Sequence, residues 1–142
     1  MCEITNRVIE QVYLLDTNIC IYIANKHPIE ILNRLEKYQA SEIKISSITV
    51  AEMEYGASKS AYRKKNREAL MNFLSPFGII NFDSMDAEIY GIIRAELERN
   101  GNIIGPYDMQ LAAQALRADY VFVTNNIREF KKVKKLKIEN WV

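Results

Sequence analysis

Three carboxylates lie where an α/β sheet builds its ligand sites. Asp16 follows the apolar run 13–15, which is typical of a short buried strand. Glu52 falls in the first turn of the helix expected after the second strand, and Asp108 in the first turn of the helix that feeds the fourth. Ligands in such sheets bind outside the carboxyl ends of the strands, so Asp16 and Glu52 should share one edge. Asp108 reaches that edge only under a further assumption, because the long helix before it returns the chain from the opposite side.

The charge of these acids limits the chemistry they can support. Converging carboxylates repel one another and raise one another's pKa, and a divalent cation removes that conflict. Hard oxygen ligands favour Mg²⁺ or Mn²⁺. The single histidine, His27, and the two cysteines exclude a His-rich or a Cys₄ zinc site, and no glycine-rich phosphate loop is present. Metal-assisted hydrolysis of a phosphodiester fits best, because the cation can activate a water and stabilise charge on the phosphate oxygens.

Each acid also has a purely structural explanation. Residues 49–52 match a capping box in which Glu52 would serve only to close the first turn of a helix. Asp108 would complement a helix dipole. A polar turn through Thr17 and Asn18 would satisfy Asp16. Only the convergence of the three acids favours a metal site over these readings.

The elements that must position the acids alternate along the chain. Strands are expected over residues 13–15, 43–46, 79–82 and 120–124, with residues 136–141 closing the chain. Helices are expected over residues 19–25, 29–38, 61–74 and 84–99. Two more helices are expected to begin at Thr49 and at Pro106, and a short helical turn is expected around residues 128–130. Strands joined through helices need crossovers. The pattern therefore predicts an α/β fold, with a mostly parallel sheet of four to five strands flanked by helices.

Length and composition define the class of protein. The chain has 142 residues, of which 49% are hydrophobic and 26% charged, which predicts one globular domain over residues 1–142. Residues 1–11 are expected to form a poorly ordered N-terminal extension. No apolar run reaches the roughly 18 residues of a membrane span. Cys2 and Cys20 do not suggest a disulfide scaffold, so we expect a cytoplasmic protein that does not act at a membrane.

Basic residues are concentrated locally, although the formal net charge is only +1. Two segments gather them: Arg63, Lys64, Lys65 and Arg67 in the first, and Lys131, Lys132, Lys134, Lys135 and Lys137 in the second. Either segment would form a strip that holds a polyanion or a solvated face. Among the aromatic residues, Phe130 and Trp141 are expected in the core. Four tyrosines remain open to base stacking or dimer contacts: Tyr22, Tyr55, Tyr62 and Tyr107.

Four segments, in order and over nearly the whole chain, resemble the motifs of PIN-domain nucleases in the form seen in VapC-type toxins. They are Leu14-Leu15-Asp16-Thr17-Asn18, residues 46–57, residues 94–97 with 105–108, and residues 123–130 with 139–141. The resemblance implies a PIN-like three-layer fold that brings the start of the Asp108 helix to the site. It also implies a Mg²⁺ or Mn²⁺ site in which Asp16 and Asp108 are the main ligands and Glu52 completes the cluster directly or through water.

The same resemblance implies an activity and partners. It implies an endoribonuclease toxin of a toxin–antitoxin pair, often directed at transfer RNA, that forms a homodimer and is covered by a small antitoxin. One position departs from the pattern, because many PIN nucleases carry a fourth acid where this chain has Asn126. We therefore expect one tightly held metal, with Asn126 orienting a water or a ligand. Glu129 either adds outer-sphere charge or pairs with a nearby lysine, and the role of Glu96 stays open.

Two other functions compete with this reading. A strand ending in an aspartate also begins haloacid-dehalogenase-type phosphatases, but these need a second aspartate where this chain has Asn18. A receiver domain would need an acidic pair at an earlier strand end, which residues 1–11 do not offer. The second competitor is a non-catalytic PIN-like module that binds RNA or a partner, although the presence of all three acids argues against a decayed site.

Overall fold

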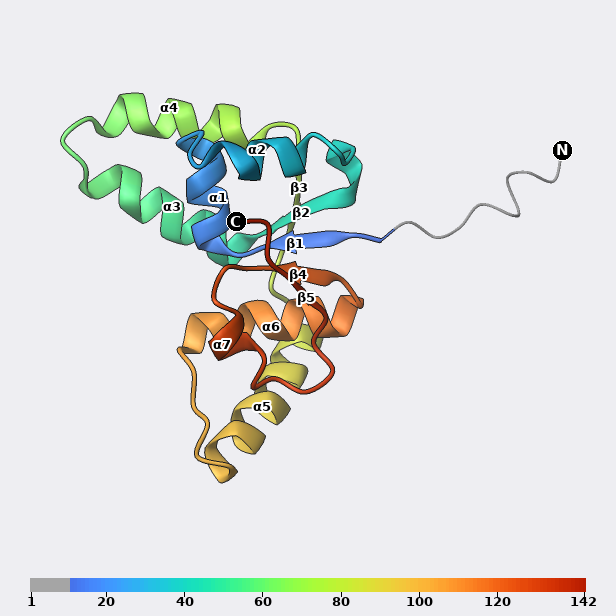
Figure 1. Cartoon of the computed structure of the whole chain (residues 1–142). Coiled ribbons are helices and arrows are strands. Elements are labelled where there is room, and N and C mark those ends of the chain that lie inside the picture. Colours follow the sequence, from blue (N-terminus) through green and yellow to red (C-terminus); the bar gives the residue numbers. More distant parts are fainter. Residues whose placement is uncertain (1–10) are drawn as a thin grey trace, which may run out of the picture.

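A computed structural model describes residues 11–142, and its centre is a sheet of five strands in the order β3-β2-β1-β4-β5 (Figure 1). The strands are β1 (Tyr13–Leu15), β2 (Ile43–Ser46), β3 (Gly78–Ile80), β4 (Val121–Val123) and β5 (Ile138–Glu139). Every neighbouring pair is parallel, which confirms the predicted fold class. The predicted extension over residues 1–11 lies, apart from Gln11, outside the described residues.

Helices cover both faces of this sheet and make three layers (Figure 1). They are α1 (Thr17–Ala24), α2 (Ile29–Leu35), α3 (Ser47–Lys59), α4 (Arg63–Leu74), α5 (Ser84–Arg99), α6 (Pro106–Ala118) and α7 (Ile127–Phe130), with a 3₁₀ turn over Ala40–Glu42. The first four helices pack on one face, and the last three on the other. No helix of the described part of the chain is both long and apolar enough to cross a membrane.

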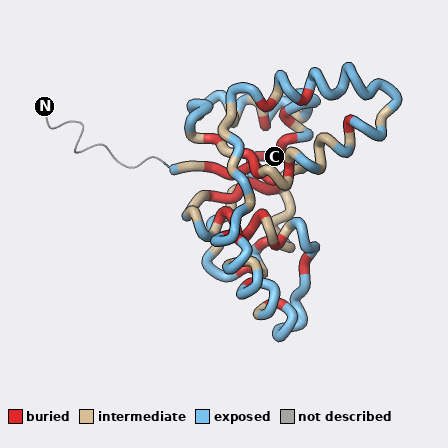
Figure 2. Tube along the Cα trace, turned by 180° about the vertical axis from the view of Figure 1, so that it is seen from behind, coloured by how far each residue is buried: buried red, intermediate tan, exposed pale blue. Residues whose placement is uncertain are grey.

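The hydrophobic core is split by the sheet into two clusters. Successive side chains of a strand point to opposite faces, so Leu15 joins the cluster under α1 to α4 while Leu14 joins the cluster under α5 to α7. Trp141 closes the first cluster and Phe130 the second, as predicted. Figure 2 shows the buried residues concentrated along the sheet and its inner helix faces. The strand ends are therefore held rigidly from both sides.

The helix boundaries differ from the predicted ones mainly at their starts. The predicted capping box of Thr49 and Glu52 is wrong, because Ser46 caps α3 by accepting a hydrogen bond of 3.0 Å from the Ile48 N–H. The helix thus begins directly after β2, and Thr49 is buried inside its first turn. Likewise α1 begins at Thr17, two residues early, because Asp16 caps it. The predicted cap at Asp83 and the proline at the start of α6 are confirmed.

Candidate active site

Asp16 is the buried centre of the site, with only 5% of its surface exposed at the carboxyl end of β1. Its two oxygens accept hydrogen bonds of 2.8 Å from the Thr17 N–H and from the Thr124 hydroxyl. Burial raises the pKa of the carboxyl above its usual range, the two hydrogen bonds oppose that shift, and the negative charge of Glu52 adds to it. Asp16 is therefore fixed in place by hydrogen bonds, and no positive side chain within residues 11–142 forms an ion pair with it.

Glu52 is tied to the Asp16 segment through a chain of hydroxyl groups. The Thr17 hydroxyl donates to the Glu52 carboxylate at 3.0 Å and lies 2.9 Å from the Thr49 hydroxyl. Because a hydroxyl has a single proton and Thr17 gives it to Glu52, Thr49 must be the donor to Thr17. This chain joins the start of α1 to the first turns of α3. It fixes the orientation of Glu52 at the same edge as Asp16.

Asp108 reaches this edge because the segment after α5 brings the chain back. This segment returns along the left of Figure 1 to the start of α6, where Gly105 and Pro106 open the helix. Burial raises the pKa of Asp108 to about 6, and the charges of Asp16, Glu52 and Glu129 add to that shift. The three predicted acids therefore interact, and the assumption that Asp108 needed is confirmed.

The end of β4 contributes a less uniform set of side chains. Glu129 on α7 pairs with Lys132 at 3.0 Å, which confirms the expected lysine partner, and its charge also raises the pKa of Asp108. The Asn126 backbone N–H donates to the Thr124 hydroxyl at 2.9 Å. Asn125 instead donates its side-chain amide to the Tyr22 hydroxyl on α1 at 3.0 Å. We call Asp16, Glu52, Asp108 and Glu129 the edge cluster.

The edge cluster has the chemistry of a cation site but is not a closed cage. Within residues 11–142, no ion pair involves Asp16, Glu52 or Asp108. In the same part of the chain, no three His, Cys, Asp or Glu side chains are arranged to hold a metal ion by themselves. Mg²⁺ commonly takes one or two protein carboxylates and keeps several waters, so this donor set suits it.

The polar turn expected at Thr17 is present, because its N–H donates to Asp16. The sequence reasoning missed the contact of the Thr17 hydroxyl with Glu52 and the contact of Thr124 with Asp16. Leu15 and Val123 are partners in the parallel register of β1 and β4. The next residues along these strands, Asp16 and Thr124, are therefore adjacent and form a hydrogen bond. The signal was the polar residue that follows each apolar strand, but it could be used only with the strand order known.

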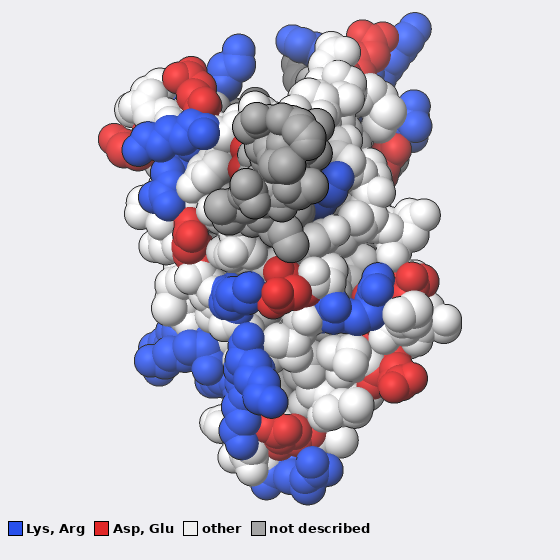
Figure 3. All heavy atoms as spheres, turned by 90° about the vertical axis from the view of Figure 1, so that its right-hand side faces the viewer, with Lys and Arg blue, Asp and Glu red and all other residues white. Residues whose placement is uncertain are grey.

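The two basic segments differ in how much of their charge is paired. In the C-terminal segment, Lys132, Lys134 and Lys137 pair with Glu129, Glu96 and Asp119. Figure 3 shows basic side chains gathered over the lower half of one face, with single carboxylates beside them. In the segment that begins α4, Arg67 pairs with Glu54, whereas residues 63–65 are exposed and make no ion pair with the described residues. The start of α4 therefore offers more unpaired charge to a polyanion.

Comparison with known proteins agrees with this arrangement. The sequence model of the PIN domain family matches residues 13–136. Ribonuclease VapC2 of Rickettsia felis is 46% identical over 131 residues, which are 92% of this chain and 98% of the relative. The tRNA(fMet)-specific endonuclease VapC of Salmonella typhimurium is 40% identical over 129 residues, which are 91% of this chain and 97% of the relative.

A solved structure gives the same answer at the level of the fold. The crystal structure of VapBC2 from Rickettsia felis bound to a DNA fragment from its promoter matches with a TM-score of 0.85 and 44% identity. The match covers 93% of this chain and 100% of the chain in that structure. The chain belongs to the PIN-domain family and, within it, to the VapC ribonucleases.

Proposed function

We propose that this chain is an endoribonuclease that hydrolyses RNA phosphodiester bonds with the help of Mg²⁺ or Mn²⁺. The observation that carries the proposal is the edge cluster itself, in which a buried carboxylate, Asp16, lies among further acids without a positive partner in the described part of the chain. A fold maintains such a concentration of negative charge at a cost in stability. Binding a divalent cation would offset that cost.

Asp16 and Asp108 would be the residues that hold the metal. Both have a pKa raised by burial and by neighbouring carboxylates, which is the condition that a cation relieves. When bound, the cation would activate a water and stabilise negative charge on the phosphate. Thr17 donates a hydrogen bond to one carboxylate oxygen of Glu52. The other oxygen would contact the metal directly or through a water.

Other residues of the chain would orient the reacting groups. The Thr124 hydroxyl donates a hydrogen bond to one oxygen of the Asp16 carboxylate, and this bond fixes the orientation of the carboxylate. Asn126 stands at the start of α7, and its side-chain amide would orient a water or the phosphate. The exposed basic residues at the start of α4 would hold the RNA backbone.

The substrate and partners follow from the relatives. The Salmonella typhimurium relative is named for transfer RNA, and we propose transfer RNA as a substrate of this chain. The Rickettsia felis structure contains VapBC2, so we propose a cognate antitoxin that covers the edge cluster and inhibits cleavage. A basic side chain of the antitoxin would complement the acids. We also propose that the chain forms a homodimer, which light scattering of the purified protein would measure.

Cleavage of RNA by the purified chain tests the catalytic proposal. Total RNA and purified transfer RNA are incubated with EDTA, Mg²⁺ or Mn²⁺, and the products are separated on a gel. We expect cleavage only with metal, and none with Asp16→Asn or Asp108→Asn. Asp119→Asn is the matched control, because Asp119 is an exposed acid at the end of α6 opposite to Asp108, and asparagine tolerates its left-handed backbone.

Two results would overturn the proposal. Equal cleavage by the wild type and both site variants would assign the activity to a contaminating nuclease. Binding of RNA without cleavage in any metal would support the non-catalytic module instead.

A further inference from the structure

A pocket of about 490 Å³ lies directly beside the edge cluster, between α3 and the start of α6. Ile48, Ala51, Glu52 and Tyr55 line it from α3, and their spacing places them on one stripe of that helix. Tyr107, in the first turn of α6, lines it from the other helix. The volume falls within the range of pockets that hold small ligands. Because Glu52 belongs to both, the pocket is continuous with the candidate active site.

The pocket is walled by two tyrosines that the fold leaves exposed. Tyr55 is 65% exposed and Tyr107 is 57% exposed. The fold brings these two rings together from different helices, α3 and α6. The opposite face of α3 supplies Val50 and Met53 to the first core cluster, so the helix is already anchored without Tyr55. The two rings are therefore not needed to complete the core. Exposed aromatic rings are the surfaces on which unpaired RNA bases stack.

A cation extends the same stripe beyond the pocket. The ammonium of Lys59, at the end of α3, lies 4.9 Å from the centre of the Tyr55 ring. From Glu52 to Lys59 the helix rises about 10 Å, and the exposed basic residues at the start of α4 follow. One face of α3 thus runs from the acid Glu52 to the ring of Tyr55 and then to positive charge. This order suits a single RNA strand, whose phosphates and bases need different surfaces.

We propose that the pocket between Tyr55 and Tyr107 holds one unpaired base of the substrate RNA, next to the phosphate that is cleaved, and that Lys59 contacts a neighbouring phosphate. This inference rests on the proposed nuclease function and adds a substrate requirement to it. The cleaved RNA must present an unstacked base beside the scissile bond, so cleavage occurs in single-stranded or loop segments. The competing occupant is a second copy of this chain, which would bury the same rings in an interface.

Kinetics of tyrosine variants test the pocket. The cleavage site of a single-stranded oligoribonucleotide is first mapped with the wild type. We expect Tyr55→Ala and Tyr107→Ala to lower kcat/KM on it by roughly 5- to 100-fold, the effect of losing one stacked base. Tyr55→Phe and Tyr107→Phe keep the ring and should stay within about twofold of the wild type. Met85→Ala is the matched control, because Met85 is 57% exposed but lies on α5.

Removal of the base from the substrate gives an independent measurement. The second substrate is an oligonucleotide with an abasic residue beside the mapped cleavage site. The wild type should show the same loss of kcat/KM on this substrate as Tyr55→Ala shows on intact RNA. The kcat/KM of Tyr55→Ala on the abasic substrate should be little lower than its kcat/KM on intact RNA, because the contact between ring and base is already absent. Additive losses would overturn the proposal, since they would show that ring and base act separately.

Two further outcomes overturn the proposal while leaving the nuclease function intact, and a third measurement separates the two proposals when the nuclease function itself fails. Wild-type kinetics of both alanine variants would show that no base stacks in the pocket. A fall in molecular mass of Tyr55→Ala by light scattering, together with its lost activity, would assign the pocket to a second copy of the chain. If the wild type cleaves no RNA, only the proposed nuclease function fails. The Kd for the oligoribonucleotide is then measured by fluorescence anisotropy in Mg²⁺. Equal Kd values for the wild type and Tyr55→Ala would overturn the base-binding pocket, and weaker binding by the variant would support it.

Discussion

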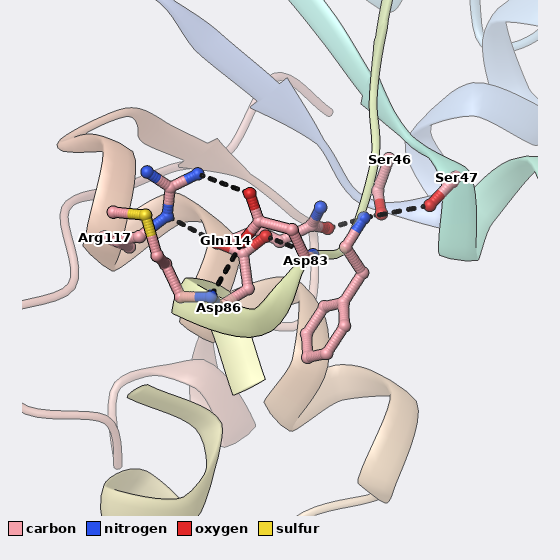
Figure 4. Close-up of polar contacts among 8 residues, drawn as sticks. Ser46, Ser47, Asp83, Asp86, Gln114 and Arg117 are labelled. Carbon is pink, nitrogen blue, oxygen red and sulfur yellow. Dashed lines mark hydrogen bonds and ion pairs between the residues drawn. The ribbon is translucent and has the colours of Figure 1, made fainter. Parts of the chain in front are cut away.

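Two groups of acidic side chains lie at helix starts in residues 11–142, and only one of the groups has an arginine partner. In the edge cluster, burial and mutual repulsion raise the pKa of Asp16 and Asp108. In the second group, which we call the capped cluster, Arg117 of α6 pairs with the buried Asp86 at 2.7 Å and approaches Asp83 at 3.8 Å (Figure 4). Here the Asp86 backbone N–H and Arg117 lower the pKa of Asp83.

The difference separates a structural role from a functional one. The capped cluster satisfies its charges internally: Asp83 and Asp86 also close a reciprocal capping box at the start of α5. Next to it in Figure 4, Ser46 donates to the Gln114 side chain, and the Phe82 N–H donates to Ser47 at 3.2 Å. The edge cluster also lies at helix starts. Within residues 11–142 only its Glu129 is paired, with Lys132, whereas Asp16, Glu52 and Asp108 make no ion pair. This contrast supports the proposal that the edge cluster binds a cation, because a charge left without a partner costs stability unless a ligand offsets it.

The largest expected difference between the two clusters is in catalytic activity. Asp16→Asn should lower kcat/KM for RNA cleavage by about 100- to 1000-fold, because a neutral amide holds a divalent cation poorly. Asp86→Asn removes an equally buried acid from the capped cluster and should leave kcat/KM near the wild type, provided that circular dichroism shows a folded protein. Comparable losses in the two variants would mean that activity reports only on folding.

The next largest effect is a loss of unfolding free energy when the capped cluster is disrupted. Arg117→Met leaves the Asp86 carboxylate, 1% exposed, without its cation. Loss of one partner of a buried pair costs about 3–5 kcal/mol, and the partial exposure of Arg117 reduces this to about 2–3 kcal/mol. Urea unfolding would measure the free energy. Arg94→Met breaks the exposed pair with Glu98 and should cost less than about 0.5 kcal/mol, so equal effects would contradict a structural role for the capped cluster.

The sequence predicted the parts of this comparison that depend on local pattern. The apolar run before Asp16, the cap at Asp83 and the proline that opens α6 are local signals, and all three lie where they were predicted. The resemblance to PIN nucleases supplied the position of Asp108, which periodicity alone left open. Local pattern succeeded because caps and strand ends are decided by neighbouring residues.

The rest depended on tertiary contacts that no local pattern contains. Asp86 and Arg117 lie on different helices, 31 residues apart, so nothing in either helix indicates that this acid is buried. Thr17 and Thr124 act through the register of neighbouring strands and helices. The same limit produced the wrong capping box at Thr49, because its hydroxyl is used by Thr17 across the sheet edge rather than by its own helix.

A cation should sharpen the comparison by stabilising only the chain with an intact edge cluster. At a Mg²⁺ concentration of about 100 times its Kd, the wild type should gain roughly 2–3 kcal/mol of unfolding free energy. Asp16→Asn should gain little, whereas Arg117→Met should gain as much as the wild type because its edge cluster is unchanged. Thermal unfolding with EDTA or Mg²⁺ measures the difference, and an equal gain by Asp16→Asn would place the cation elsewhere.

The smallest effect concerns the cost of the unneutralised charge itself. The folded pKa of Asp108 is about 6, above the ordinary value of 3.8, so this group stabilises the folded state fully below pH 3.8 and loses that contribution as the pH rises through 6. At pH 7 in EDTA, Asp108→Asn should therefore be more stable than the wild type, by on the order of 1 kcal/mol because solvent screens this half-buried site. The gain should vanish near pH 4, where Asp108 is largely protonated in the folded wild type. Urea unfolding at both pH values measures it, with Asp119→Asn as the exposed control. If Asp108→Asn were less stable than the wild type at pH 7, the edge cluster would be a structural group like the capped cluster, and the contrast between the two would disappear.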